Sequence, residues 1–393
     1  MQGSKLILVS ISMMLCFVLK AQESMTYSEA NDRSFILYEK AAWKELLQFG
    51  KTAIAAKQDF ILLRLRMGYA AFMLSGYSEA LQHYEAVLQK DTYNETARYY
   101  SWLSLQYLNR NELAGTHVRY FSRELLQKEK LKPVAFTGAG IESSFKNTGL
   151  SVRGSGWYNR IDLGLRLGWN LYMNQSVAMF NQTIGEPGLT AVINNRSINI
   201  NQKEYYNRLI FNAGRHWQVK GAYHYLYTPF NNFVYDNQAA MIALRYNGSY
   251  VNVQADAIVG NVTDTSQQQY NLHLEVYPRG NLSLYGISTA TIRNRNGQTG
   301  FNFKQVAGCR LFKNTWLEAN ATLGPFSNLF ENDALYLYNA IDRNLFKGGA
   351  TLYMAIRPTL LLQAGYTFEQ RERFKTNNTF YQHSITGGLS WKF

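Results

Sequence analysis

Beyond residue 133 the sequence alternates between apolar and polar residues, and this alternation constrains the fold more than any other feature. In the segment 157–169, aliphatic residues occupy the odd positions from Ile161 to Leu167, with Trp157 and Trp169 at the two ends. The even positions carry arginine, aspartate and glycine. A period of two is that of a β-strand with one apolar and one polar face. We therefore expect this region to be built of β-strands.

The same division recurs in the segments 251–259 and 272–276, where valine, alanine and leucine alternate with asparagine, glutamine, aspartate, histidine and glutamate. Charged residues make up 17% of the chain and aromatic residues 15%, which excludes a long disordered protein. The one long apolar run lies at the N-terminus, so a bundle of membrane helices is also excluded. Aromatic residues at both ends of an apolar strand face are typical of membrane interfaces, and the polar face then lines a wet lumen. The pattern predicts an antiparallel transmembrane β-barrel over residues 133–393.

The last eight residues, Thr-Gly-Gly-Leu-Ser-Trp-Lys-Phe, place Gly388, Trp391 and Phe393 near or at the end of an alternating segment. This ending resembles the C-terminal signal of Gram-negative outer-membrane β-barrels. The resemblance implies an outer-membrane location and recognition by the barrel assembly machinery.

The alternating segments number about fourteen, and twelve or sixteen strands are alternatives because the segment 325–344 is long enough to contain a further hairpin. Short links are predicted near residues 169–170, 215–216, 247–248, 279–280, 313–314 and 357–358. Long links are predicted over residues 146–156, 184–201, 228–236, 261–269, 293–299, 325–344 and 370–378. Membrane barrels of this kind have short periplasmic turns and longer extracellular loops. An even number of strands then leaves both ends of the barrel sequence, and the region before it, in the periplasm.

The N-terminus has the features of a secretory signal peptide over residues 1–21. Lys5 precedes an apolar stretch over residues 6–19, which is shorter than the roughly 20 residues of a spanning helix. Cys16 follows leucine rather than the small residue of a lipidation site, so we expect no lipid anchor. Cleavage after Ala21 leaves Cys309 as the only cysteine, which excludes an intrachain disulfide.

Residues 22–132 have a helical pattern rich in leucine, alanine and charged residues, and we expect a periplasmic helical domain. Small and aromatic residues recur there at a spacing that resembles the 34-residue tetratricopeptide repeat. The residues that carry this resemblance are Gly68, Ala71, Tyr77, Ala80 and Tyr84, with Ala114 one period further on. The resemblance implies that the small residues lie where two antiparallel helices meet and that Tyr84 fills the adjacent groove.

The repeat pattern is incomplete. Arg64 stands where the family has tryptophan, Thr92 where it has proline, and the repeats on either side of the central one match weakly. An irregular set of helical hairpins is the alternative. Repeats of this family bind proteins or peptides, so the resemblance implies a periplasmic protein or peptide as partner.

The chain has a net charge of +13, and most of the excess lies beyond residue 133. If the polar face of each strand lines the lumen, a set of charged residues and one histidine faces it. These are Arg160, Asp162, Arg166, Arg208, Lys220, Arg245, Asp256, His273, Glu275, Arg310, Glu318, Lys347, Arg357 and Glu369. A free basic wall favours anionic solutes. The other interpretation is that the cations pair with acids on neighbouring strands and fill the interior, since a barrel of about fourteen strands lies between filled and open sizes.

The sequence shows no complete catalytic constellation, and we expect no enzyme. His383 and Ser384 are adjacent and therefore face opposite sides of a strand. His273 and Glu275 share a face but have no evident nucleophile. Asp236, Asp264 and Asp333 are expected in extracellular loops.

No residue pattern indicates a metal or a cofactor, and the basic charge of an exported barrel does not indicate nucleic-acid binding. The expected partners are outer-membrane lipid, the barrel assembly machinery and a periplasmic protein or peptide. The first functional hypothesis is therefore a membrane anchor or assembly platform for a periplasmic partner. The alternative is a porin-like channel with a basic lumen that favours anionic solutes, and an outer-membrane enzyme comes third.

Overall fold

The computed structural model describes residues 25–185, 197–230, 233–374 and 376–393. The predicted signal peptide lies outside these residues. Seven helices precede the strands in the described part of the chain: α2 Tyr27–Glu39, α3 Trp43–Ala55, α4 Ile61–Met73, α5 Tyr77–Lys90, α6 Glu95–Tyr107, α7 Asn111–Val118 and α8 Arg123–Lys128. No helix among the described residues is long and apolar enough to cross a membrane.

The chain divides into two compact units. The first unit consists of the residues up to Ser75 together with residues 79–100. The second contains residues 76–78 and everything from Ser101 onward, so α7 and α8 belong to the same unit as the strands. The first unit is helical and the second contains the barrel.

The helical unit is held together by small residues packed against large ones. A Cβ atom at Gly68 would lie 2.7 Å from a ring carbon of Tyr84, so the predicted packing of a small residue beside this aromatic ring is present. Ala71, Ala80 and Tyr84 are fully buried in one apolar core. At the start of α2, Thr26 and Glu29 form a capping box that satisfies the first backbone N–H groups. Membership of the tetratricopeptide family stays a prediction.

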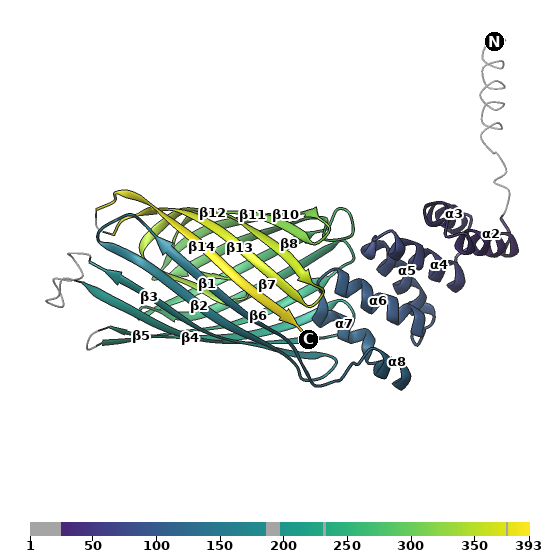
Figure 1. Cartoon of the computed structure of the whole chain (residues 1–393), viewed down its shortest axis with the longest axis horizontal. Coiled ribbons are helices and arrows are strands. Elements are labelled where there is room, and N and C mark those ends of the chain that lie inside the picture. Colours follow the sequence, from purple (N-terminus) through teal and green to yellow (C-terminus); the bar gives the residue numbers. More distant parts are fainter. Residues whose placement is uncertain (1–24, 186–196, 231–232, 375) are drawn as a thin grey trace, which may run out of the picture. The chain divides into compact units, whose positions relative to one another are not determined.

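Fourteen strands form a closed antiparallel barrel in the described residues, as the fold prediction required (Figure 1). The strands are β1 Ala135–Asn147, β2 Arg153–Arg166, β3 Leu171–Ile184, β4 Ile198–Asn212, β5 Trp217–Phe230, β6 Phe233–Asn247, β7 Val251–Val262, β8 Thr265–Val276, β9 Leu284–Arg295, β10 Gln298–Phe312, β11 Thr315–Glu331, β12 Tyr336–Arg357, β13 Leu360–Glu372 and β14 Thr379–Lys392. Each strand pairs with its neighbours in sequence, and β1 closes the barrel on β14, with Gly138 opposite Lys392. The sheet therefore has no free edge.

The barrel exposes apolar residues on its outside and buries polar residues inside. Ile161, Ile242 and Ile385 are more than half exposed, whereas Asn252 and Gln269 are fully buried. A sandwich of two sheets would place its apolar faces against each other, which is the reverse of this arrangement. Full burial of an aliphatic side chain is worth about 1.5–3 kcal/mol, so an exterior of this kind requires an apolar surrounding.

The two ends of the barrel differ less in link length than the sequence predicted. The termini end carries the links after even-numbered strands, where β1 begins and β14 ends, and the opposite end carries the links after odd-numbered strands. Long links expected at 261–269 and 293–299 are in fact the two-residue turns 263–264 and 296–297, and β5 and β6 are joined across residues 231–232 rather than 228–236. At the termini end, the short link expected near 279–280 spans residues 277–283.

These errors have a common cause. Residues 263, 264, 296 and 297 all have positive φ, as tight hairpin turns require, and polar residues flank them. The strands are 12 to 22 residues long, whereas about 9–11 suffice to span a membrane. The excess length carries polar residues, which the sequence analysis assigned to loops.

The last strand presents its aromatic residues outward. Trp391 and Phe393 are exposed, and their rings stack with centroids 6.3 Å apart. Gly388 lies against Gln363, whose side-chain nitrogen would be 2.5 Å from an added Cβ atom. Recognition of this segment by an assembly machinery stays a prediction.

Candidate functional site: the barrel lumen

The end of β11, the turn at residues 332–335 and the start of β12 fold into the lumen instead of forming an external loop. The pairing of β11 with β12 shifts register between Leu323 and Phe326, beside Gly324, whose φ is +91°. An added Cβ atom at Gly324 would lie 2.3 Å from the carbonyl oxygen of Phe301, so this bend requires glycine. We call residues 325–345 the lumen hairpin. The prediction that 325–344 is an extracellular loop is wrong, although a hairpin was anticipated there as a possibility.

One side of the lumen hairpin packs on apolar residues of the barrel wall. Phe330 and Ala334 are buried in a cluster with Tyr206, Met241 and Ile258, which lie on β4, β6 and β7. The main chain of the hairpin is also bound, because Gln269 Nε2 donates to the Phe330 carbonyl at 2.7 Å and the Tyr206 hydroxyl donates to the Asp333 carbonyl at 2.8 Å. The wall residues come from inward-facing positions, which places the hairpin inside the barrel.

Asp333, at the tip of the hairpin, joins two cations of the wall. Its carboxylate lies 2.7 Å from Arg208 Nη1 and 2.9 Å from Lys220 Nζ, and it accepts a hydrogen bond from Gln254 at 2.8 Å. The tip residues 332–334 all have positive φ, which directs the turn toward the wall. Asp333 was expected in an extracellular loop, and that prediction is wrong because the hairpin folds inward.

The hairpin also binds the other side of the lumen. Arg153 on β2 forms two bonds of 2.8 Å with the carboxylate of Asp342. The Tyr336 hydroxyl donates to Glu142 on β1 at 3.0 Å. The hairpin therefore connects β1 and β2 with β4 and β5 across the lumen.

Glu331, next to the tip of the hairpin, belongs to a further cluster of charges. The Glu331 carboxylate lies 2.9 Å from Lys304 Nζ and 2.6 Å from Lys347 Nζ. The two lysines lie on β10 and β12, the strands on either side of β11, and they neutralise the charge of Glu331. Breaking a buried pair of this kind by removing one partner costs about 3–5 kcal/mol.

Most of the other lumen candidates are also paired. Arg245 forms bonds of 2.6 and 2.7 Å with Glu275, and Arg371 lies 2.9 Å from Glu369. Arg160 lies 2.9 Å from Asp162 and 3.4 Å from Glu142. Of the two interpretations that the sequence left open, the structure favours cations paired with acids over a free basic wall.

His273 has a different partner from the one the sequence suggested. Its Nε2 atom lies 2.7 Å from Asp256, and its Nδ1 atom lies 3.0 Å from the Thr289 hydroxyl. Glu275 is bound instead by Arg245 and Asn252. The predicted acid–base pair of His273 and Glu275 is therefore not brought together, because each side chain reaches an inward-facing partner on a neighbouring strand.

The remaining candidates lie toward the termini end. Arg166 donates to the Lys132 carbonyl and stacks over the Trp169 ring at 4.9 Å. The Glu318 carboxylate accepts a hydrogen bond of 2.6 Å from the Tyr285 hydroxyl. Arg310 and Arg357 are exposed at the ends of their strands. These residues are separate from the charge network around the lumen hairpin.

Helix α7 lies against the termini end of its own unit. Arg110, just before the helix, donates to the Gly248 carbonyl at 2.6 Å, and Asn212 donates to the Glu112 carbonyl at the same distance. Gly115 is closely packed, since an added Cβ atom would be 2.3 Å from the carbonyl oxygen of Trp169. A small cavity of about 180 Å³ is lined by residues of α7 together with Arg208, Lys220 and Arg245 of the lumen. Helix α7 therefore lies across the lumen at this end. Ala114 of α7 is buried.

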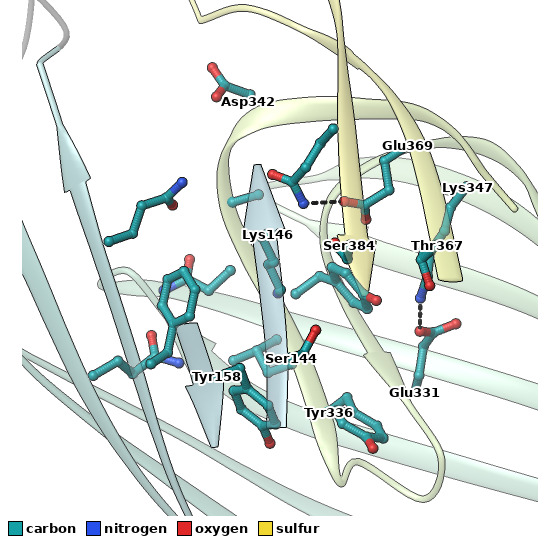
Figure 2. A pocket seen from close by; sticks show the side chains of 18 of the residues that line it. Ser144, Lys146, Tyr158, Glu331, Tyr336, Asp342, Lys347, Thr367, Glu369 and Ser384 are labelled. Atoms are coloured by element: carbon teal, nitrogen blue, oxygen red, sulfur yellow. Dashed lines mark hydrogen bonds and ion pairs between the residues drawn. The ribbon is translucent and has the colours of Figure 1, made fainter. Parts of the chain in front are cut away.

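A larger cavity of about 820 Å³ remains between the lumen hairpin and the wall formed by β1, β2 and β12–β14 (Figure 2). Its lining includes Thr148 and Phe374, which lie in links at the opposite end. Sequence reasoning missed Arg153, Glu331 and Asp342, which have the same charged types as the candidates but lie near expected loops. No local signal sets them apart, since the segment 325–344 is about as charged as the rest of the chain and half of its residues are hydrophobic.

Comparison with known proteins adds little beyond the fold. No protein-family model and no curated protein sequence matches the chain. Among solved structures, the translocator domain of the autotransporter NalP from Neisseria meningitidis is 14% identical, with a TM-score of 0.33, and the match covers 74% of this chain and 99% of that one. The outer membrane protein Omp33 of Acinetobacter baumannii is 7% identical, with a TM-score of 0.38 and coverage of 66% and 99%. A loop-deletion mutant of OmpT, an outer membrane protein of Vibrio cholerae, is 8% identical, with a TM-score of 0.38 and coverage of 67% and 100%. Likenesses at this level carry no inference about activity.

Proposed function

We propose that this chain is an outer-membrane β-barrel with a closed lumen that anchors or assembles a periplasmic partner through its N-terminal helices. The apolar exterior and the resemblance of the C-terminus to an outer-membrane assembly signal support this location. The even strand number leaves both barrel termini at one end, which supports a periplasmic helical region. Outer-membrane lipid and the barrel assembly machinery are the partners that this proposal requires for insertion, and it assigns no catalytic role.

The observation that carries the proposal is the double closure of the lumen. The lumen hairpin is ion-paired at Asp333 to β4 and β5 and at Asp342 to β2. At the termini end, Arg110 donates to the link that follows β6, Gly115 of α7 packs on the link that follows β2, and Glu112 of α7 accepts a hydrogen bond from the end of β4. A solute channel needs a continuous passage, whereas an anchor needs only a stable wall.

Conductance in planar bilayers tests the closed lumen. We expect purified full-length protein to give no stable ohmic steps, and a variant that lacks both closures, with Asn-Gly in place of residues 325–345 and with residues 22–132 removed, to conduct. Heat-modifiable migration on gels shows that both proteins are folded before they are compared. Stable steps from the unmodified protein would instead establish the solute channel.

Site-specific crosslinking with a photoreactive amino acid tests whether the helical unit binds a partner. Leu62 is a half-exposed residue of α4 in the helical unit, and Val259 is an equally exposed residue of the outer barrel face. We expect a probe at residue 62 to crosslink a protein or peptide in intact cells and a probe at residue 259 to crosslink lipid. If both positions crosslink lipid alone, the helices are not a platform.

A further inference from the structure

The 820 Å³ cavity beside the lumen hairpin has the size of a site for a small organic molecule. Its described lining contains seven lysine and arginine residues but only five carboxylates, so it carries an excess of positive charge. Hydroxyl and amide side chains make up much of the rest of the lining. The cavity therefore offers hydrogen-bond donors as well as positive charge.

The excess charge can be traced to particular residues. Among the described lining residues, Lys146 and Arg295 are the cations that have no carboxylate oxygen within 4.0 Å. Arg295 donates instead to the Val262 carbonyl at 2.9 Å. The Lys146 ammonium lies over the Phe180 ring at 5.2 Å. Of these two cations, Lys146 is the one that also has no hydrogen-bond acceptor among the described residues.

Hydroxyl groups surround Lys146 on the inner face of β1, β2 and β14. Lys146 is directly opposite Ser384, and Ser144 is directly opposite Tyr158 on one side and Thr386 on the other. Opposed residues in a sheet have Cβ atoms about 4.5–5.5 Å apart, so one small group can contact several of them. Figure 2 shows Lys146, Ser144 and Ser384 on the wall of the cavity, with the hydroxyl of Tyr158 directed away from Lys146.

One of these hydroxyl groups has a donor to spare. Ser144 accepts a hydrogen bond of 2.9 Å from Thr386, which leaves its own O–H free to donate. The Tyr158 hydroxyl is buried away from the accessible surface of the cavity, so it does not contribute a donor there.

We propose that this cavity is a binding site for a small hydroxylated organic anion, whose carboxylate or phosphate group is held by Lys146 and Ser144. The ammonium supplies the charge, the Ser144 hydroxyl supplies a hydrogen bond to an anionic oxygen, and the amide-rich lining receives the hydroxylated part. The site does not depend on whether the lumen conducts, so it can fail while the proposed function stands.

Titration calorimetry on the detergent-solubilised full-length protein tests the site. Glucuronate probes the carboxylate, glucose 6-phosphate probes the phosphate, and glucose is the uncharged control. We expect at least one anion to bind about tenfold or more tightly than glucose, because hydrogen bonds to charged groups are the strong ones. The relative affinity of the two anions identifies the preferred group.

Variants separate the site from general effects of charge. Lys146→Met should weaken anion binding about tenfold or more, and Ser144→Ala should weaken it a few-fold. Lys313→Met removes the same charge in the turn between β10 and β11 and should leave the affinity unchanged. Equal binding of anions and glucose, no binding of either anion, or an unchanged affinity in folded Lys146→Met protein would each overturn the proposal.

Discussion

Asp333 and His83 are both buried ionisable residues, but their neighbours favour opposite charge states. Asp333 lies between two cations, which stabilise its carboxylate. His83, in α5, receives the guanidinium of Arg64 at 3.2 Å on its Nδ1 atom, which can accept a hydrogen bond only when it carries no proton. Burial, followed by the nearby charge of Arg64, lowers the pKa of His83 to about 4. The stability of the helical unit should therefore depend on pH.

The sign follows from the two states of the chain. The folded protein keeps His83 neutral down to about pH 4, whereas the unfolded chain binds the proton near its ordinary pKa of 6.5. This contribution is fully present above pH 6.5 and is lost as the pH falls toward 4, with a total of about 3 kcal/mol. We expect the helical circular-dichroism signal of the full-length protein to become less heat-resistant over this range.

His83→Gln is the matched variant, because glutamine can accept the bond from Arg64 without titrating. Its melting temperature should change little between pH 6.5 and about 4. Below that range Asp59 also contributes, since its hydrogen bonds with Arg64 lower the pKa of its carboxyl group. If the variant and the unmodified protein lose stability in parallel between pH 6.5 and 4, His83 is not the responsible group.

At the scale of elements, the helices, the strands and five of the six short links at the termini end followed from local sequence, whereas several links at the opposite end did not. The alternation around Ile161 survives in the structure because each residue of a barrel strand faces either the outside or the lumen. The turns at 263–264 and 296–297 were misread as long loops because polar residues are equally suitable for a turn and for a strand that extends past the apolar band. Local sequence also gives no sign that the segment after Gly324 bends inward, since its partners Arg208 and Arg153 lie far away in sequence.

Two glycines in the helical unit offer a matched test of close packing. A Cβ atom at Gly68 meets the rigid ring of Tyr84, whereas one at Gly50 meets the flexible side chain of Met67. Gly68→Ala should therefore destabilise the unit by about 1–3 kcal/mol, as overpacking typically does. Gly50→Ala should cost less, because Met67 can adopt another rotamer.

Chemical unfolding of the two variants, followed by the helical signal, measures this difference. Alanine also has the higher helix propensity, which favours both substitutions equally by about 1 kcal/mol. A variant at residue 68 that is as stable as the variant at residue 50 would show that the ring of Tyr84 moves aside.

At the scale of the whole molecule, the stability of the barrel depends on the ion pairs between its wall and the lumen hairpin. Asp333→Asn keeps the size of the side chain but leaves Arg208 and Lys220 without their acid. We expect the hairpin to lose about 3–5 kcal/mol of binding to the wall and the folded band on gels to convert at a lower temperature. Protease cleavage within residues 325–345 should also become faster.

Asp264→Asn, in the exposed turn between β7 and β8, is the control for the loss of one negative charge. It should behave like the unmodified protein in both measurements. Equal heat resistance of the two variants would mean that the hairpin is held by its apolar contacts with Tyr206 and Met241 rather than by Asp333.

The pairing of β1 with β14 sets the order in which this molecule can be put together. These strands lie at the two ends of the barrel sequence, so the seam between them forms only after the last residues have been synthesised. The lumen hairpin is bonded to β1 and β2 on one side of that seam and lies between β10 and β13 on the other. Its 21 residues can enter before the seam is sealed or afterwards through the end of the cylinder at which β11 meets β12, but the bonds to Glu142 and Arg153 need β1 and β2 in place. The first strands of the barrel are therefore partners both of its last strand and of the hairpin inside it.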